Sequence, residues 1–148
     1  MKKVERTLVI LKPDAVKAKL IGRILRRLEN ETKARIINMK MVKATREQLV
    51  DHYEGVGKLL TRIGKDVFEE TMDYMSSGMI VPIVLEGEEA IIRVRKLCGP
   101  TRPWEAEPGT IRGDFGRKDS SLPIRNVIHA SANTEEAKEE IKIWFPKS

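Results

Sequence analysis

The sequence predicts a mixed α/β fold of the α+β class, and three observations lead to this prediction. Short apolar segments rich in β-forming residues alternate with segments whose apolar residues recur at helical spacing. With the short inserted helices left out, the order is strand, helix, strand, strand, helix, strand. That order is the split βαβ, or ferredoxin-like, arrangement βαββαβ, in which an antiparallel four-stranded sheet carries helices on one face.

Length and composition predict one domain spanning residues 1–148. Hydrophobic residues at 41% and charged residues at 34% fit a soluble globular protein, and no apolar run approaches the length of a membrane span. The first apolar segment, residues 8–11, is preceded by Glu5 and Arg6 and ends at Lys12, unlike an export signal. We therefore expect a cytoplasmic protein that does not bind membranes.

The charge and the metal-binding residue types limit the classes of partner. The net charge is +6, which favours anionic partners such as nucleotides or nucleic acid, although lysine and arginine are spread along the whole chain. One cysteine, Cys98, cannot form an internal disulfide, and two histidines do not make a zinc-type cluster. A structural metal is therefore not expected.

The first half of the chain begins with a strand and a helix. Residues 6–11 are an apolar run that Pro13 ends, which places Lys12 at the C-terminal edge of a buried strand. Residues 20–30 carry apolar side chains at helical spacing with arginines opposite, which predicts an amphipathic helix.

A half-buried strand and a short helix are expected next. Ile37, Met39 and Met41 alternate with polar residues, which predicts that they form the buried face of the strand. Thr45 and Gln48 have the spacing of a capping box and open the helix.

The segment Gly55–Leu60 invites comparison with a phosphate-binding loop. That motif needs Ser or Thr after the Gly-Lys pair and another glycine five residues before the Gly, where this chain has Leu59 and His52. We therefore interpret the segment as a connection between helices, followed by a helix over residues 67–75.

The second half contains a third strand, a helix and a long irregular segment. Residues 79–85 form the strand, and Pro82 within it suggests an edge position or a bulge. Residues 88–97 form the helix, with cations toward its end. Residues 99–125 are rich in proline and glycine and show no period; a loop of that length in a small domain is usually functional.

A short strand is expected at Val127–Ile128, and His129 follows it just before the start of a helix. Asn133 and Glu136 fit the capping pattern that opens this helix, and Ile143-Trp144-Phe145 closes it as an apolar anchor. A histidine at such a junction can act as a neutral nucleophile near pH 7. The alternative is a histidine that only fills the core.

Several cations could form an anion pocket together with this histidine. The long segment holds Thr101, Arg102 and Arg112, and Arg95 and Lys12 lie at the ends of neighbouring elements. Guanidinium groups suit phosphate oxygens, although a single arginine more often pairs with a carboxylate or lies in water. The glycines that flank Arg112 and Asp114 favour a rigidly placed cation.

Taken together, these motifs resemble the nucleoside diphosphate kinase family, and the match spans nearly the whole chain. The matching segments are Lys12-Pro13-Asp14, His52-Tyr53, Gly109–Phe115, Asn126-x-x-His129-x-Ser131 and Glu140-Ile141-x-x-Trp144-Phe145.

The resemblance implies that the γ-phosphate of ATP or another nucleoside triphosphate moves to a nucleoside or deoxynucleoside diphosphate by a ping-pong route through phosphohistidine. His129 would attack through Nδ1, Glu140 would hold its tautomer, and Ser131 would support Glu140. Mg²⁺ would arrive on the nucleotide phosphates and not in a protein site. The positions that match ribose and phosphoryl contacts are Lys12, Tyr53 and Asn126, and those that match the phosphate clamp are Arg95, Thr101 and Arg112.

The resemblance also implies a homo-oligomer, because Pro103 falls in the loop that builds subunit contacts in the family; we expect a hexamer, with a tetramer as the alternative. Two departures stand out. The family's usual Gly-Ser-Asp-Ser is here Ala130-Ser131-Ala132-Asn133, which removes an acidic residue beside the histidine. The family's Pro-Phe-Phe sequence is missing, which leaves Phe68 and Leu60 as candidates for the residue that stacks on the base.

Two other hypotheses compete with the kinase. An RNA-binding module of the RRM type shares the strand order, but its RNP1 motif needs an aromatic where this chain has Asp114, so nucleic acid is expected to bind at most nonspecifically. A catalytically inactive regulatory subunit of the same fold is the other, which the Ala132 change allows and the retained site residues oppose.

Overall fold

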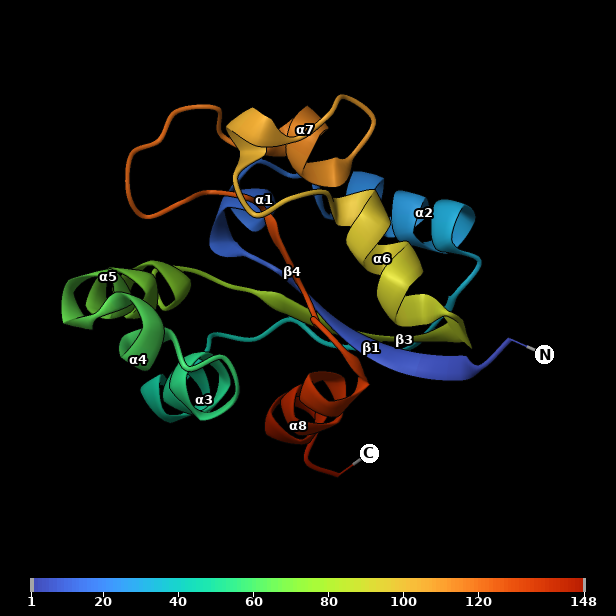
Figure 1. Cartoon of the computed structure of the whole chain (residues 1–148), viewed down its shortest axis with the longest axis horizontal. Helices are drawn as coiled ribbons and strands as arrows, with labels where there is room; N and C mark the ends of the chain where they lie inside the picture. The colour runs from blue at the N-terminus through green and yellow to red at the C-terminus, as the bar shows by residue number, and fades with distance from the viewer. Residues whose placement is uncertain (1, 148) are drawn as a thin grey trace.

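The computed structural model describes residues 2–147, which form a four-stranded antiparallel sheet between two layers of helices (Figure 1). The strands lie in the order β2-β3-β1-β4. They are β1 (Val4–Leu11), β2 (Arg35–Met39), β3 (Val81–Glu88) and β4 (Ile128–Ala130). The predicted ferredoxin-like arrangement is confirmed.

Among residues 2–147, longer and shorter helices lie between the strands, and one helix follows the last strand. The longer helices are α2 (Ile21–Thr32), α5 (Lys65–Met75), α6 (Ala90–Cys98) and α8 (Thr134–Trp144). The short ones are α1 (Pro13–Lys17), α3 (Arg46–Val50), α4 (Leu59–Ile63), α7 (Ile111–Phe115), the π-helical turn η1 (Asp51–Val56) and the 3-10 turn η2 (Pro103–Glu105). The segment 99–125, expected to be irregular, thus contains η2 and α7.

Strand β1 is the centre of the fold. It pairs with β3 along its whole length and with β4 on its other side. Val9 and Leu11 belong to a core cluster with α2 and α6, whereas Leu8 and Ile10 belong to a second cluster with α5 and α8. Because successive side chains of a strand point to opposite faces, both faces of β1 are apolar and both are covered.

The expectation that helices lie on one face of the sheet was therefore too narrow. The two crossover helices of the βαββαβ unit, α2 and α6, do share one face (Figure 1). The inserted helices α3 and α5 and the final helix α8 cover the other face, where Trp144 and Phe145 are buried as the predicted anchor.

The predicted orientation of β2 was wrong. Ile37, Met39 and Met41 are 37%, 46% and 48% exposed, while Ile36 packs against the core. The β2–β3 pairing has a register shift between Ile36 and Asn38, and β2 is an edge strand. Apolar alternation showed the period of the strand but not which face turned inward, because an irregular edge strand can present apolar side chains to solvent.

Pro82 does not mark an edge strand or a bulge, as had been expected. It lies in the central strand β3, opposite Ile10 of β1. The Pro82 carbonyl accepts from the Lys40 N–H at 3.1 Å, just beyond the last residue of β2. The N–H and the C=O of one strand residue face the same neighbouring strand, so the N–H that proline lacks would also have faced Lys40. Pairing resumes at Val42 and Ile80 in the same register, so proline is tolerated here at the loss of the one ladder hydrogen bond that it cannot donate.

Among residues 2–147, no helix is long and apolar enough to cross a membrane.

Candidate active site

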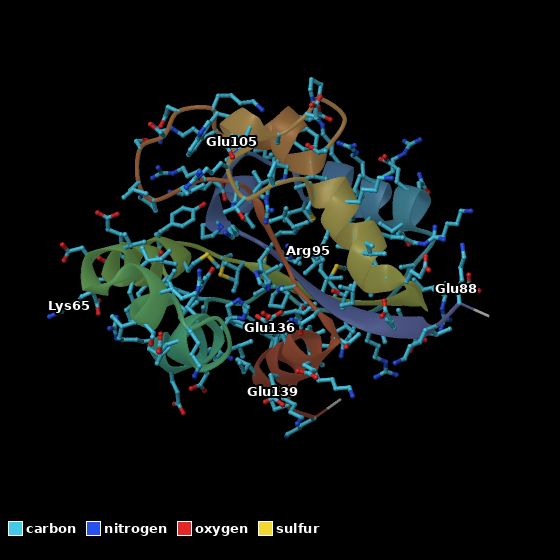
Figure 2. All side chains as sticks on the ribbon, in the orientation of Figure 1. Lys65, Glu88, Arg95, Glu105, Glu136 and Glu139 are labelled. Atoms are coloured by element: carbon cyan, nitrogen blue, oxygen red, sulfur yellow. The ribbon has the colours of Figure 1, made fainter. Side chains whose placement is uncertain are left out.

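A cavity of about 870 Å³ opens between the α4–α5 region on one side and the segments that lead into α7 and β4 on the other. Figure 2 shows Arg95 of α6 and Glu136 of α8, which both line it, near the middle of the molecule. The predicted site residues that line the cavity come from every part of the chain: Lys12, Tyr53, Arg95, Thr101, Arg112, Asn126, His129 and Glu140.

Four predicted residues, Ser131, Arg102, Phe68 and Leu60, do not line the cavity. Ser131 is fully buried behind it and reaches it through Glu140. Arg102 is exposed and forms a surface ion pair with Glu105 at 3.6 Å, outside the cavity lining. Phe68 is only 5% exposed and packs in the core cluster with Met72 and Met75, so the prediction that it contacts the base is wrong.

Leu60, the other candidate for the base contact, is 40% exposed and also lies outside the cavity lining. Its neighbour Leu59 lines the cavity, as do Ile63 of α4 and Val67 of α5. The sequence contains a pattern that fits the position of Val67. Phe68, Met72 and Met75 have helical spacing and define the core face of α5, which leaves Val67 on the adjacent face.

His129 and Glu140 form the chemical centre of the site. His129 Nε2 lies 3.0 Å from Glu140 Oε1, and Ser131 Oγ donates to the same oxygen at 2.6 Å. Burial alone would raise the pKa of the Glu140 carboxyl, but His129 beside it, the two hydrogen bonds and His52 outweigh burial and hold the pKa below its usual range.

An ionised Glu140 can only accept hydrogen bonds, so His129 must carry its proton on Nε2. In the neutral imidazole, Nδ1 then keeps a free lone pair. This arrangement leaves Nδ1 of His129 chemically able to act as a nucleophile.

Local structure brings these two residues together. His129 sits on β4 opposite Ile10 of β1, and the chain turns directly from β4 into α8. Asn133 caps α8 by accepting from the Glu136 N–H at 2.8 Å, as predicted. Glu140 lies on the buried face of this helix and is 2% exposed.

A hydrogen-bonded chain fixes the polar groups opposite His129. Lys12 Nζ donates to Asn126 Oδ1 at 2.8 Å, and Asn126 Nδ2 donates to the Thr101 carbonyl at 2.9 Å. Burial, together with the nearby Arg112, lowers the pKa of Lys12 to about 8, against a smaller opposing effect of Asp14. Lys12 is thus a desolvated cation that an anion in the cavity would stabilise.

Arg112 is held by backbone carbonyls. Its Nη1 donates to Gly99 O at 2.8 Å and its Nη2 donates to Ile128 O at 2.6 Å, which leaves the buried Nε without a partner among the described residues. Thr110 caps α7, and a Cβ on Gly113 would lie 2.0 Å from the Glu107 carbonyl oxygen. The predicted rigid placement of Arg112 therefore depends on this close backbone packing.

A γ-turn precedes β4. Val127 has a φ of 63°, and the Ile128 N–H donates to Asn126 O at 2.7 Å across it. A β-branched residue rarely adopts this conformation, which costs on the order of 1–3 kcal/mol. The Val127 N–H is anchored by Asp14 Oδ2 at 3.1 Å, and its carbonyl accepts from the Lys12 N–H at 2.9 Å. The strained turn fixes Asn126 between Lys12 and Thr101.

Two residues at the cavity, His52 and Glu136, received no role in the site from the sequence, although His52 belongs to one of the matching segments. His52 is 2% exposed and lies against His129, with 4.5 Å between the ring centroids. Glu136 lines the cavity from the first turn of α8, so an acidic group remains near the site although Ala132 replaces the family's aspartate. The spacing of residues along the chain does not show that either side chain lies beside His129 or the cavity, because that depends on how η1 and α8 pack.

The comparisons with known proteins agree with this geometry. Residues 5–148 match the family model described as nucleoside diphosphate kinase. The nucleoside diphosphate kinase of Methanocaldococcus jannaschii is 48% identical over 95% of this chain and 93% of its own length. That of Pyrococcus furiosus is 46% identical over 98% of this chain and 85% of its own length.

Solved structures show the same fold. A nucleoside diphosphate kinase of Borrelia burgdorferi, in a transition-state mimic with vanadate and ADP, has a TM-score of 0.87 and 38% identity, covering 96% of this chain and 87% of that one. An NDP kinase of Pyrobaculum aerophilum has a TM-score of 0.83 and 35% identity, covering 98% and 97%. This chain therefore belongs to the nucleoside diphosphate kinase family and is a nucleotide phosphotransferase.

Proposed function

We propose that this chain transfers the γ-phosphate of a nucleoside triphosphate, mainly ATP, to a nucleoside or deoxynucleoside diphosphate through a phosphohistidine at His129. The observation that carries the proposal is the contact between His129 Nε2 and Glu140, which leaves Nδ1 as the nucleophilic atom at a cavity whose lining includes the cations Lys12, Arg95 and Arg112.

Two half-reactions balance the transfer. First, the Nδ1 lone pair forms a bond to the γ-phosphorus while the bond from that phosphorus to the β–γ bridging oxygen breaks, and its electron pair leaves on the nucleoside diphosphate. Second, a terminal phosphate oxygen of another nucleoside diphosphate attacks the same phosphorus, and the electron pair of the P–N bond returns to Nδ1. Glu140 stabilises the imidazolium character that develops between them.

The cations and neutral donors position the phosphates. Phosphoryl transfer depends mainly on alignment and on neutralising charge at the phosphate oxygens. We assign Arg95, Arg112 and Thr101 to the phosphate clamp and Lys12 with Asn126 to the transferred group and the ribose. The hydroxyl of Tyr53 is buried without a hydrogen-bond partner among the described residues and lines the cavity, as expected of a group that donates to a bound nucleotide.

Mg²⁺ would enter with the nucleotide. Among residues 2–147, the group of side chains suited to a metal is His52, His129 and Glu140. Mg²⁺ prefers oxygen ligands, and two of these three side chains offer imidazole nitrogen. The residues therefore do not fit a resident magnesium site, and the ion would remain on the phosphates, where it neutralises charge.

The base would lie against aliphatic side chains. Leu59, Ile63 and Val67 line the cavity on one side, and Leu122 and Pro123 line it from the segment before β4. Such walls contact any base through its faces without reading its edge, which suits a kinase of broad base specificity.

We also propose that the protein is a homo-oligomer, with a hexamer preferred over a tetramer. Ile37 and Met39 of the edge strand β2, and Met41 just after it, are exposed apolar side chains, and the outer side of β2 lacks a strand partner among the described residues. An apolar edge of this kind is normally covered. Light scattering coupled to gel filtration measures the state, and a monomer at micromolar concentration contradicts the proposal.

Incubation of the purified protein with γ-labelled ATP and Mg²⁺, without acceptor, tests the reaction. We expect acid-labile, alkali-stable label on the wild type, none on His129→Ala, and release of the label on addition of GDP. Absence of label under conditions in which ATP binds would contradict the proposed route.

A further inference from the structure

His52 is a buried imidazole that the proposed reaction leaves without a role. It lies on η1, a π-helical turn in which the Gly57 N–H donates to the His52 carbonyl at 3.1 Å. The wider turn brings the consecutive residues His52 and Tyr53 to the same cavity, and π turns occur frequently at functional sites.

Trp144 fixes the tautomer of His52. Trp144 Nε1 lies 3.1 Å from His52 Nδ1, and an indole nitrogen can only donate. Nδ1 is therefore the acceptor, and the neutral ring carries its proton on Nε2. Rotating the ring by 180° would place a C–H against the indole N–H, so only one orientation satisfies this buried donor.

His52 in turn restricts the ring of His129. The two rings meet edge to face, with a centroid separation of 4.5 Å and an interplanar angle of 77°. Glu140 holds the His129 ring through one atom, Nε2. A single hydrogen bond does not fix the plane of the ring, which can still turn about the line that joins Nε2 to Oε1. Contact with His52 opposes this rotation.

We propose that His52 is a positioning residue: locked by Trp144 as the Nε2–H tautomer, it fixes the ring plane of His129 so that Nδ1 faces the γ-phosphate. This inference rests on the proposed role of His129 as the nucleophile. It assigns a function to the Trp144–His52 pair, which would otherwise be core packing.

The surroundings of His52 keep it neutral. It faces Lys12 at the end of β1, His129 on β4 and Glu140 on α8, with Tyr53 beside it on η1. Burial, and then His129, lower the pKa of His52 to about 3, with a further lowering by Lys12 and an opposing effect of Glu140. No second positive charge therefore arises beside the imidazolium that forms at His129.

Nitrogen-15 NMR of the two imidazoles tests the arrangement directly, because the chain contains two histidines. We expect His52 to show an unprotonated Nδ1 and a protonated Nε2 from pH 8 to pH 5. In Trp144→Phe we expect a mixture of tautomers at His52. A wild-type His52 that carries its proton on Nδ1, or that titrates near its ordinary pKa, overturns the proposal.

Single-turnover phosphorylation of His129 measures the consequence. We expect His52→Phe to slow phosphorylation about tenfold or more, while the nucleotide Kd stays within about twofold, because misplacing a reacting atom costs rate and not binding. Phe68→Leu is the control, since Phe68 lies in the same core cluster as Trp144 but outside the cavity. An unchanged rate in His52→Phe, or an equal loss in Phe68→Leu, contradicts a positioning role.

If His52→Phe does not fold, Trp144→Phe carries the same rate test, and the NMR measurement needs only the wild type. Failure of the proposed function itself looks different: the wild type then forms no phosphohistidine, whatever tautomer His52 adopts.

Discussion

Glu140 keeps a negative charge although its side chain is almost fully buried. Its oxygen Oε1 receives both the His129 and the Ser131 contacts, so the carboxylate is stabilised where it controls the histidine tautomer. Removing the charge should therefore affect the reaction more than removing the hydroxyl that supports it.

We expect Glu140→Gln to slow phosphorylation of His129 by about a hundredfold, since losing one preorganised electrostatic partner costs on the order of 3 kcal/mol in the transition state. Ser131→Ala should raise the activation free energy of the same step by about 1 kcal/mol, the usual net value of one hydrogen bond. Quenched-flow measurement of label on His129 compares the two variants. Equal rates for Glu140→Gln and wild type would refute the role of the carboxylate.

Lys12 predicts a pH dependence of nucleotide binding. Its lowered pKa of about 8 means that the free protein loses this positive charge as pH rises through 8, whereas an ordinary lysine keeps it to about 10.5. Because phosphate binds the charged form, the affinity for ADP should fall about tenfold between pH 7 and pH 9.

Calorimetric titration with ADP across this range measures the effect. Lys12→Arg is the matched control, because a guanidinium stays charged throughout and should abolish the dependence. An affinity of the wild type that stays constant to pH 9 contradicts the lowered pKa.

The short helix α7 shows how an element places one side chain. Thr110 caps it, and Gly113 allows the helix to approach the Glu107 carbonyl more closely than any Cβ would permit. Arg112 sits between these two residues and reaches the carbonyls of Gly99 and Ile128. The position of Arg112, which we assign to the phosphate clamp, therefore depends on the whole turn.

Gly113→Ala should destabilise the protein by about 1–3 kcal/mol, because its Cβ would overlap a backbone atom that cannot move alone. Gly22→Ala is the matched substitution: Gly22 lies in α2, and beyond its chain neighbours and the helix's own backbone no atom lies within 4 Å of the added Cβ, so we expect stabilisation by about 0.5–1 kcal/mol. Urea unfolding compares both. Similar effects in the two variants would show that close packing at Gly113 is unimportant.

At the scale of the whole molecule, burial of His52 makes stability depend on pH. Its folded pKa of about 3 lies below the unfolded value of 6.5, so below pH 6.5 the unfolded chain takes up a proton that the folded chain does not. Stability from this residue is complete above pH 6.5 and is lost progressively as pH falls toward 3; at pH 5 the loss is about 2 kcal/mol.

The unfolding free energies of wild type and His52→Gln are measured at pH 7.5 and at pH 5. The difference between the two proteins in the change with pH isolates the contribution of His52, because all other groups titrate in both. The wild type should lose about 2 kcal/mol more than the variant over this interval. Equal losses would mean that His52 is protonated in the folded state.

Much of this protein could be predicted from its sequence. Strand and helix periodicity, together with caps at Thr45 and Asn133, depend on contacts between near neighbours, so the order of elements was predictable. The motif residues Lys12, Arg112, Asn126 and His129 were recognised by type and order, and the fold brings all four to one cavity.

What the tertiary structure decided were properties that depend on residues far apart in the chain. Phe68 lies in the core and Val67 at the cavity because α5 packs against the sheet with that face inward. Ile37 is exposed because β2 lies at the edge of the sheet, and Pro82 is tolerated in a central strand because the pairing resumes in register at Val42 and Ile80. His52 on η1 contacts Trp144 on α8 and His129 on β4. Sequence patterns within one element cannot predict these contacts, because the three elements meet only in the folded sheet and its helices.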